Sequence, residues 1–350
     1  MPLFVDLPGV LDGFIAVNRS RATAAGLDPF AYERVTARLE TLADWPAAFH
    51  AAGRSHLAAG EAAEAAGAHV SAGEAYRRAA RWFHCAGWLP HPDGALAATA
   101  ADRAMGRALA LLDPSAVRLE GGTFTGWLRR PRGVVAAVGV VLVVPGMDSG
   151  KEEFHGVVEA LLARGLAVLA LDGPGQGVRA ADSAPRADYQ AVVAEALDAL
   201  AALPAGTGVD PDRAALIGLS LGGYYAAVAA AHEPRVRAAA TVSGPYRLLW
   251  PELPPFVAET LTRRSGGPEA ARAFAGRVDL RAHAARIDCP LLVVDGGRDV
   301  IPGVVNGEPL ARAARLGEYL LVPHGDHLLG NARTDWLPAT ADWLAARLRG

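Results

Sequence analysis

The sequence is short of cysteine and has almost no excess of charge of either sign, and both shortages exclude classes of protein. Cys85 and Cys289 are the two cysteines among 350 residues, which is too few for a disulfide framework or a cysteine-rich metal cluster. The formal net charge is −3 at pH 7, whereas nucleic-acid-binding domains carry clustered positive charge. We therefore expect no metal site, no organic cofactor and no nucleic-acid partner.

The sequence also lacks a continuous apolar run of the length that a membrane span requires. Its first ten residues, MPLFVDLPGV, include an early aspartate and no positive region, and so do not fit a signal peptide. Hydrophobic residues make up 51% of the chain and charged residues 20%, which favours a large folded core over disorder. We expect a soluble cytoplasmic protein that acts on a small molecule without a membrane partner, and for which a homodimer is plausible.

The chain changes character near residue 115. Residues 1–114 show no β pattern, and we expect them to form a separate helical module. In this part Trp45 and Pro46 are predicted to end the first helix. The helices expected here span residues 30–43, 47–66, 71–86 and 93–112.

Residues 115–350 alternate between apolar runs typical of strands and helical segments. Such alternation predicts an α/β domain with a doubly wound, mostly parallel sheet and right-handed crossovers. Residues 245–288 are irregular and rich in proline, and we expect them to form an additional helical insertion. Ser149 begins the sequence S-G-K-E, which reads as a capping box for a helix reaching residue 163. The expected strands span residues 117–120, 124–128, 134–144, 166–171, 214–217, 236–243, 291–295 and 318–322.

A candidate nucleophile follows the apolar run of residues 214–217. Residues 218–222 read G-L-S-L-G between an expected strand and an expected helix, the context in which G-x-S-x-G forms a nucleophile elbow. A tight turn there would present the hydroxyl of Ser220 at a helix N-terminus, where developing negative charge is stabilised. The alternative interpretation is a glycine-flanked turn with an ordinary serine.

A serine needs a base to remove its proton, and the base needs an acceptor to hold it in the correct tautomer. Asp299 lies in the loop D-G-G-R-D after one later strand, and His327 lies in G-D-H after the next. The order serine, aspartate, histidine is the one expected for this architecture. Asp295 is an alternative acid and His324 an alternative base; the turn chemistry favours Asp299, and the loop position favours His327.

Attack on a carbonyl also requires donors for the oxyanion. The backbone N–H of Leu221, directly after the nucleophile, is one candidate. The second is the backbone N–H of Met147, in the loop P-G-M-D-S-G-K-E-E, where Gly146 allows a close approach of the backbone.

With these motifs in place the chain resembles an α/β-hydrolase. The resemblance rests on P-G-M-D-S-G-K-E-E, D-G-P-G-Q-G, G-L-S-L-G-G-Y-Y, D-G-G-R-D-V-I-P and G-D-H, and on the helical segment V-S-A-G-E-A-Y-R-R-A-A-R-W-F-H. The last segment resembles a branch that carries an N-terminal helical cap. That branch includes the 2,6-dihydroxypseudooxynicotine hydrolases, the fungal Ayg1-type hydrolases and the FrsA-like proteins. It implies that residues 1–114 are a cap and residues 115–350 the catalytic domain.

The resemblance further implies hydrolysis of a C–C bond in a β-diketone-like or polyketide substrate, or of an ester. An enolate leaving group must be protonated at carbon, and Asp148 and Glu252 are candidate acids. The favoured alternative is that Asp148 caps its loop and that Glu252 is a solvated residue of a proline-rich loop. Tyr246 and Trp250 are candidates for the mouth of the site, or for packing between cap and core. Aromatic side chains of the cap that could reach inward, or pack between helices, are Trp82, Phe83, His84 and Trp88.

Three other readings remain open from the sequence. His327 and Asp299 could eliminate a carboxylate such as acetate, which would make the protein a lyase. The chain could be a binding protein on a hydrolase scaffold, because fold alone does not prove function. A thioesterase or peptidase would share the same three side chains.

Overall fold

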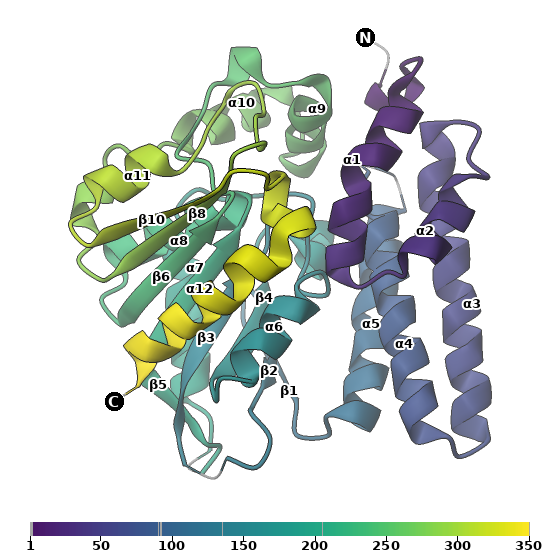
Figure 1. The fold of residues 1–350 in the computed structure, drawn as a ribbon, viewed down its shortest axis with the longest axis horizontal. Helices are drawn as coiled ribbons and strands as arrows, with labels where there is room; N and C mark the ends of the chain where they lie inside the picture. Colours follow the sequence, from purple (N-terminus) through teal and green to yellow (C-terminus); the bar gives the residue numbers. More distant parts are fainter. Residues whose placement is uncertain (1–2, 90, 92, 135, 205, 350) are drawn as a thin grey trace.

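The computed structural model describes residues 3–89, 91, 93–134, 136–204 and 206–349 (Figure 1). The first part of the chain is helical, as expected, and the rest alternates between strands and helices. The N-terminal helices are α1 (Val10–Ala25), α2 (Pro29–Thr36), α3 (Trp45–Ala65), α4 (His69–Ala86) and α5 (Gly94–Leu112), with short 3-10 helices at Phe4–Asp6 and Leu42–Asp44.

Two expectations for this region were wrong. The helix predicted over residues 30–43 ends at Thr36. Trp45 and Pro46 begin α3 instead of ending a helix, because a proline in the first turn removes an N–H group that has no helical acceptor. The buried ring of Trp45 stacks on Phe49 with 3.9 Å between centroids and anchors the core of the module.

The sheet has eight strands in the order β1-β2-β4-β3-β5-β6-β8-β10. The first two form an antiparallel hairpin, β2 also pairs antiparallel with β4, and the remaining pairs are parallel. The strand expected over residues 134–144 starts only at Val138, and residue 135 lies outside the described residues. The strands are β1 (Val117–Glu120), β2 (Thr125–Arg129), β3 (Val138–Val144), β4 (Ala167–Asp172), β5 (Val209–Leu219), β6 (Val236–Val242), β8 (Leu291–Gly296) and β10 (Gly317–Val322).

Helices cover both faces of this sheet and bury its apolar strands. The helices α6 (His155–Leu162) and α12 (Arg333–Leu348) lie in front in Figure 1, whereas α7 (Gln190–Ala201) and α8 (Leu221–His232) lie behind. The remaining elements are α9 (Pro255–Arg264), α10 (Pro268–Arg277), α11 (Glu308–Ala313), the short pair β7 (Arg247–Leu248) and β9 (Val304–Val305), and 3-10 helices at Gly177–Ala181, Trp250–Glu252, Ala284–Arg286 and His327–Ala332.

The helix predicted to start at Ser149 starts at His155. The Ser149 hydroxyl donates to the Glu153 carboxylate, a side-chain contact, and does not cap a helix. The segment between β3 and α6 is therefore an irregular loop, and its side chains are free to point toward neighbouring elements.

A buried cluster of charges joins the helical module to the sheet domain. Lys151 is the only lysine of the sequence, and its ammonium group is almost fully buried. Its Nζ atom lies 2.9 Å from Asp102 of α5, 2.9 Å from Glu152 and 2.7 Å from Asp172 at the end of β4. These carboxylates raise the pKa of Lys151 above its usual value although burial alone would lower it. Because an unpaired buried charge is costly, the cluster favours one arrangement of module and sheet.

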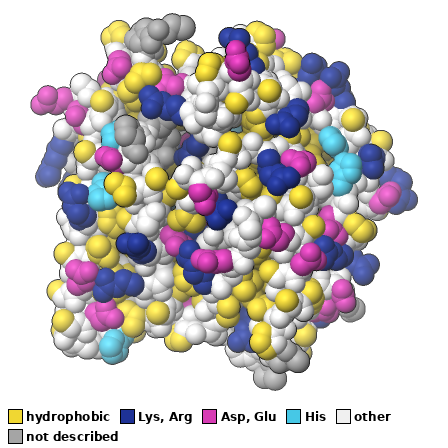
Figure 2. Space-filling view, turned by 180° about the vertical axis from the view of Figure 1, so that it is seen from behind, with side chains coloured by type: hydrophobic (Ala, Val, Ile, Leu, Met, Phe, Trp, Pro, Cys, Tyr) yellow, Lys and Arg dark blue, Asp and Glu magenta, His cyan; other side chains and the backbone are white. Residues whose placement is uncertain are grey.

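The outer surface carries both signs of charge. On the face seen from behind, Lys and Arg side chains alternate with Asp and Glu side chains, with hydrophobic groups between them (Figure 2). Among the helices of the described ranges, none combines the length and apolar character that crossing a membrane requires.

Candidate active site

Ser220 stands in a strained turn between β5 and α8. Its backbone has φ 55° and ψ −129°, a conformation that L residues rarely adopt and that costs on the order of 1–3 kcal/mol. The turn is tight enough that a Cβ atom on Gly222 would lie 2.2 Å from the carbonyl oxygen of Val144. Only glycine fits there, so the second glycine of the motif has the steric role that the sequence predicted.

His327 and Asp299 complete a hydrogen-bonded chain with Ser220. The Nε2 atom of His327 lies 3.0 Å from the Oγ atom of Ser220, and Nδ1 lies 2.9 Å and 3.0 Å from the two carboxylate oxygens of Asp299. Burial alone would lower the pKa of His327, but the Asp299 carboxylate outweighs it, and the net shift is upward. Such an imidazole can accept the serine proton and be stabilised as an imidazolium.

The structure places the two alternative residues elsewhere. Asp295 is buried, and its Oδ2 atom accepts hydrogen bonds from the N–H of Gly307 and the hydroxyl of Tyr319, at 2.9 Å and 3.3 Å. Burial raises the pKa of Asp295 to about 6. His324 is exposed and lies 2.9 Å from Asp335. Neither contacts the serine or the histidine of the chain described above.

The backbone around His327 is strained as well. Leu328 and Leu329, which follow it, have φ angles of 66° and 50°, and Ser243 after β6 has φ 51°. With Ser220 these are all the non-glycine residues with positive φ in the described chain. Clustering of such strain at one place is typical of functional sites. No motif in the sequence marks Ser243 as part of this group.

Met147 and Leu221, the expected oxyanion donors, both border the space in front of Ser220. Within the described ranges, neither backbone N–H donates to a protein acceptor. The loop carrying Met147 is supported from behind by Gln176, whose Nε2 group donates to the carbonyl of Pro145 and whose Oε1 accepts from Tyr189 at 2.7 Å. Gln176 belongs to D-G-P-G-Q-G, so that motif holds the neighbouring loop in place.

A cavity of about 1080 Å³ opens onto these groups, and most of its wall is apolar. It lies between α1 of the helical module, α9 of the insertion and the ends of the strands. This volume would accommodate a ligand of drug-like size or larger. Apolar side chains from the two helices that line it are Val10, Phe14, Val17, Phe256, Val257 and Leu261.

Of the candidate auxiliary residues, only Asp148 borders this cavity. Its carboxylate pairs with Arg21 at 2.8 Å, so it is a fixed hydrogen-bond acceptor and is poorly suited to donate a proton. Glu252 is exposed and lies outside the cavity wall. Tyr246 and Trp250 also lie outside it and pack against the core beside the sheet.

The aromatic group of the helical module does not reach the cavity, and of the two interpretations of these residues the structure shows packing between helices. Trp82, Phe83 and Trp88 are buried within the helical module. His84 is buried too, and its Nε2 atom lies 2.8 Å from Glu153. Most side chains of α4 fill the interior of the helical module. Its side-chain contacts with the sheet domain include this pair and Arg77, whose Nη1 atom lies 3.3 Å from Nε2 of His155 in α6.

The helix that does reach the site is α1, which the sequence analysis did not single out. Asn18, Ser20 and Arg21 of α1 border the cavity. The helix has a weakly amphipathic sequence, and its polar residues read as a solvated face. Two of them instead contact the loops that carry Met147 and His327.

Comparison with known proteins gives the same assignment of fold. Residues 136–267 match the family model described as serine aminopeptidase, S33. Hydrolase LUC6 of Fusarium sp. is 34% identical over 222 residues, which are 58% of this chain and 52% of that protein. The chain thus spans about half the length of the fungal relatives it matches.

A bacterial relative matches over more of the chain. The 2,6-dihydropseudooxynicotine hydrolase of Paenarthrobacter nicotinovorans is 29% identical over 248 residues, 68% of this chain and 66% of that protein. The crystal structure of 2,6-dihydroxy-pseudo-oxynicotine hydrolase superposes with a TM-score of 0.83 and 25% identity, covering 94% of this chain and 95% of the other. The superposition includes the helical module as well as the sheet. The chain therefore has the α/β-hydrolase fold and is similar to hydrolases of this fold that carry an N-terminal helical module.

Proposed function

We propose that this protein is a serine-dependent hydrolase that cleaves a bulky, largely apolar or aromatic substrate at a carbonyl carbon. The observation that carries the proposal is the continuous hydrogen-bonded chain from Ser220 through His327 to Asp299, located on a strained turn at the end of a cavity. A serine in this setting is activated because the imidazole accepts its proton as it attacks.

The first half of the reaction follows from these positions. The Oγ atom of Ser220 attacks the carbonyl carbon while its proton passes to Nε2 of His327. The oxyanion that forms is stabilised by the backbone N–H groups of Met147 and Leu221. The imidazolium is held by Asp299 until it returns the proton to the leaving group, which is an alkoxide for an ester or an enolate carbon for a β-diketone.

The second half removes the acyl group. Water, deprotonated by His327, attacks the ester carbonyl of acylated Ser220 and releases a carboxylic acid. The other carboxylates that border the cavity, Asp148 and Asp326, are bonded to Arg21 and Ser20. His327 is therefore the proton donor that best fits both the ester and the C–C reaction.

The shape of the cavity and the relatives support the substrate class. Its wall is mostly apolar, which fits a largely apolar molecule whose carbonyl is held at Ser220. The relatives described above are named hydrolases, one of them a 2,6-dihydropseudooxynicotine hydrolase. We place C–C bonds of β-diketone-like or polyketide compounds first and esters second.

The proposal is tested by intact mass spectrometry after incubation with a small fluorophosphonate. Wild type is expected to gain one adduct, mapped to Ser220, whereas Ser220→Ala gains none and His327→Ala reacts far more slowly. A folded wild-type protein that gains no adduct would contradict serine catalysis. Turnover in heavy-oxygen water then separates hydrolysis, which incorporates solvent oxygen into the acid, from elimination, which leaves an alkene without it.

A further inference from the structure

Helix α1 of the helical module contacts both loops that the proposed reaction depends on. The hydroxyl of Ser20 donates to the carboxylate of Asp326, the residue directly before His327. The neighbouring Arg21 pairs with Asp148, the residue directly after Met147, and with Glu153 further along the same loop. One turn of a cap helix is thus bonded to the histidine loop and to the loop that carries a candidate oxyanion donor.

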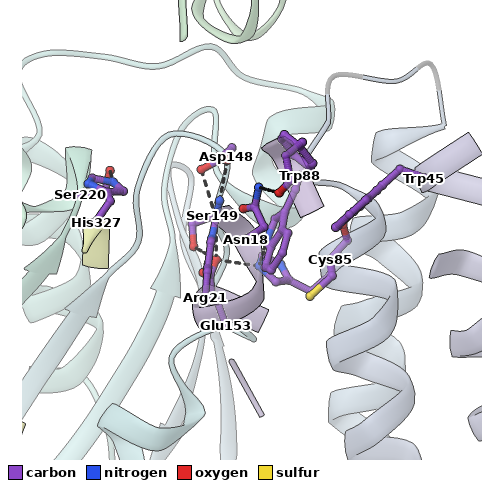
Figure 3. Close-up of polar contacts among 12 residues, drawn as sticks. Asn18, Arg21, Trp45, Cys85, Trp88, Asp148, Ser149, Glu153, Ser220 and His327 are labelled. Atoms are coloured by element: carbon purple, nitrogen blue, oxygen red, sulfur yellow. Dashed lines mark hydrogen bonds and ion pairs between the residues drawn. The ribbon is translucent and has the colours of Figure 1, made fainter. Parts of the chain in front are cut away.

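The geometry of Arg21 is that of a bridge between two points of one loop (Figure 3). Its Nη1 atom lies 2.8 Å from Asp148, its Nε atom lies 2.7 Å from Glu153, and its Nη2 atom lies within 3.2 Å of both carboxylates. The guanidinium carbon lies 4.3 Å from the centre of the Trp88 ring. A planar guanidinium can make paired bonds to two carboxylates and stack on an aromatic ring at once, which an ammonium cannot.

The two carboxylates differ in how they are held without Arg21. Glu153 also contacts His84 and accepts from Ser149, and its side chain is only 2% exposed. Burial alone would raise the pKa of Glu153, but Arg21 and His84 hold it well below its usual range. The hydrogen bonds of the Asp148 side chain, among the described residues, all come from Arg21. Arg21 therefore ties Asp148, whose described side-chain hydrogen bonds come from Arg21 alone, to Glu153, which several groups hold.

We propose that Arg21 is a positioning residue that holds the backbone of Met147 where the oxyanion forms, so that the helical module contributes to catalysis and not only to enclosure. The proposal rests on the proposed function. Its physical basis is that a displacement of about 1 Å in a catalytic group can cost on the order of 100-fold in rate. The backbone N–H of Met147 belongs to the residue directly before Asp148, whose carboxylate Arg21 binds.

Two other arginines bind the same helix, and one of them provides a matched control for the loss of an arginine contact with α1. Arg81 of α4 donates to the carbonyl of Gly26, and Arg333 of α12 donates to the carbonyl of Ala24, each at 3.1 Å. Both bind the C-terminal end of α1, where cations are favourable. Neither borders the cavity in front of Ser220. Loss of Arg81 therefore removes a contact that holds the C-terminal end of α1 but leaves the contacts of Arg21 with the Met147 loop in place.

The experiment compares Arg21→Met, Arg21→Lys and Asp148→Asn with Arg81→Met. The readouts are the rate of phosphonylation of Ser220 by a fluorophosphonate, and kcat and KM for a p-nitrophenyl ester. The inhibition constant of an alkyl trifluoromethyl ketone, which forms an oxyanion on the serine, is measured alongside. Circular dichroism and thermal unfolding establish that each variant is folded.

We expect kcat and the phosphonylation rate of the Arg21 and Asp148 variants to fall about 10- to 100-fold, as for partial loss of an oxyanion donor. KM is expected to change less than about threefold, since the lost interaction is made in the transition state. The inhibition constant of the ketone should rise by the same factor as kcat falls. Arg81→Met should lower the unfolding temperature but leave kcat, KM, the phosphonylation rate and the inhibition constant near their wild-type values.

The inference is overturned if folded Arg21→Lys and Asp148→Asn match Arg81→Met in kcat and in ketone inhibition. If Arg21→Met does not fold, Asp148→Asn decides, because it leaves the pair between Arg21 and Glu153 intact. Failure of the proposed function gives a different result. In that case the wild-type protein itself is not phosphonylated at Ser220, or Ser220→Ala turns the ester over as fast as wild type.

Discussion

The hydroxyl of Ser243 accepts a hydrogen bond from the backbone N–H of Leu328 at 3.0 Å. Both residues have positive φ, and Leu328 directly follows His327. The bond therefore joins the end of β6 to the start of the strained loop that positions the histidine. It supplies the acceptor that a buried N–H group in irregular backbone requires.

Replacing Ser243 with alanine should release this loop. We expect Ser243→Ala to lower the free energy of unfolding by about 1–3 kcal/mol, because a buried donor loses its acceptor. The phosphonylation rate of Ser220 should fall as well, since His327 loses its position. The control is Ser55→Ala, whose exposed hydroxyl bonds only within α3 and whose loss should affect neither quantity. Equal rates of Ser220 phosphonylation in Ser243→Ala and Ser55→Ala would show that Ser243 does not hold His327 in position.

The activity of the protein should depend on the charge of His327. The base must be neutral, and Asp299 raises its pKa above the usual value, which is about 6.5. We therefore expect kcat/KM to rise with pH through a midpoint above about 6.5. Asp299→Asn should move that midpoint to lower pH and reduce the maximum rate.

The same shift has a consequence for stability. A group whose pKa is raised on folding stabilises the fold below its unfolded pKa, and this contribution disappears as pH rises through the folded pKa. Asp299→Asn should therefore remove stability at pH 5 and change it less at pH 9, as measured by urea unfolding. Burial raises the pKa of Asp295 to about 6, so this carboxyl titrates in a similar pH range. The Asp295→Asn variant therefore serves as the comparison. A loss in Asp299→Asn that is the same at both pH values would argue against this coupling.

Gly146 lies directly against Ser220, the proposed nucleophile. A Cβ atom placed on it would come within 2.9 Å of the Cβ atom of Ser220 and 3.3 Å of its Oγ atom. We expect Gly146→Ala to fold but to lower the phosphonylation rate by about 100-fold, because the serine or the oxyanion loop must move. Gly276→Ala in α10, where a Cβ atom meets nothing within 4 Å, should remain fully active. A fully active Gly146→Ala variant would mean that the loop carrying Met147 can shift without lowering the reaction rate.

Lys151 reports on the seam between the helical module and the sheet domain. Its ammonium group is 1% exposed and contacts three carboxylates, so an amine-reactive ester should not modify it in the native state. Labelling should appear only when the seam opens, in parallel with unfolding by urea. Peptide mapping by mass spectrometry measures this directly at a single site, since no other lysine competes.

Weakening the seam should expose Lys151 earlier. Asp102→Asn removes one of the three charges, and we expect faster labelling at low urea together with a lower unfolding midpoint. The comparison is Asp288→Asn, a change at an exposed surface carboxylate. Rapid labelling of Lys151 in the folded wild-type protein would contradict the buried cluster.

The elements that could be predicted from the sequence are those with a strict local requirement. The turn around Ser220 needs glycines at fixed positions, as the contact between Gly222 and Val144 shows. The loops of Asp299 and His327 follow apolar strands in a fixed order, and parallel strands bring their ends to one edge. Their hydrogen bonds to one another follow from that topology.

Other expectations were wrong where tertiary contacts decide. Ser149 begins a good capping pattern, yet its hydroxyl donates to Glu153 and caps no helix. The same Glu153 accepts a hydrogen bond from Arg21 of α1, a contact that no local pattern predicts. Trp82 and Phe83 have the aromatic character of ligand contacts, but they fill the interior of the helical module. A stripe of aromatic residues looks the same in both cases, since burial against protein and burial against ligand require the same side chains.

The sequence alone determined the α/β-hydrolase fold and the three residues of the hydrogen-bonded chain, because each depends on local turn chemistry and strand order. Only the tertiary structure decided that α1 forms the wall of the cavity and that Arg21 bridges Asp148 and Glu153. These contacts join residues more than a hundred positions apart, and no local pattern specifies which polar residues of a helix meet carboxylates of a distant loop. They depend on how the helical module docks, which is set by the packing and buried charges of the whole interface.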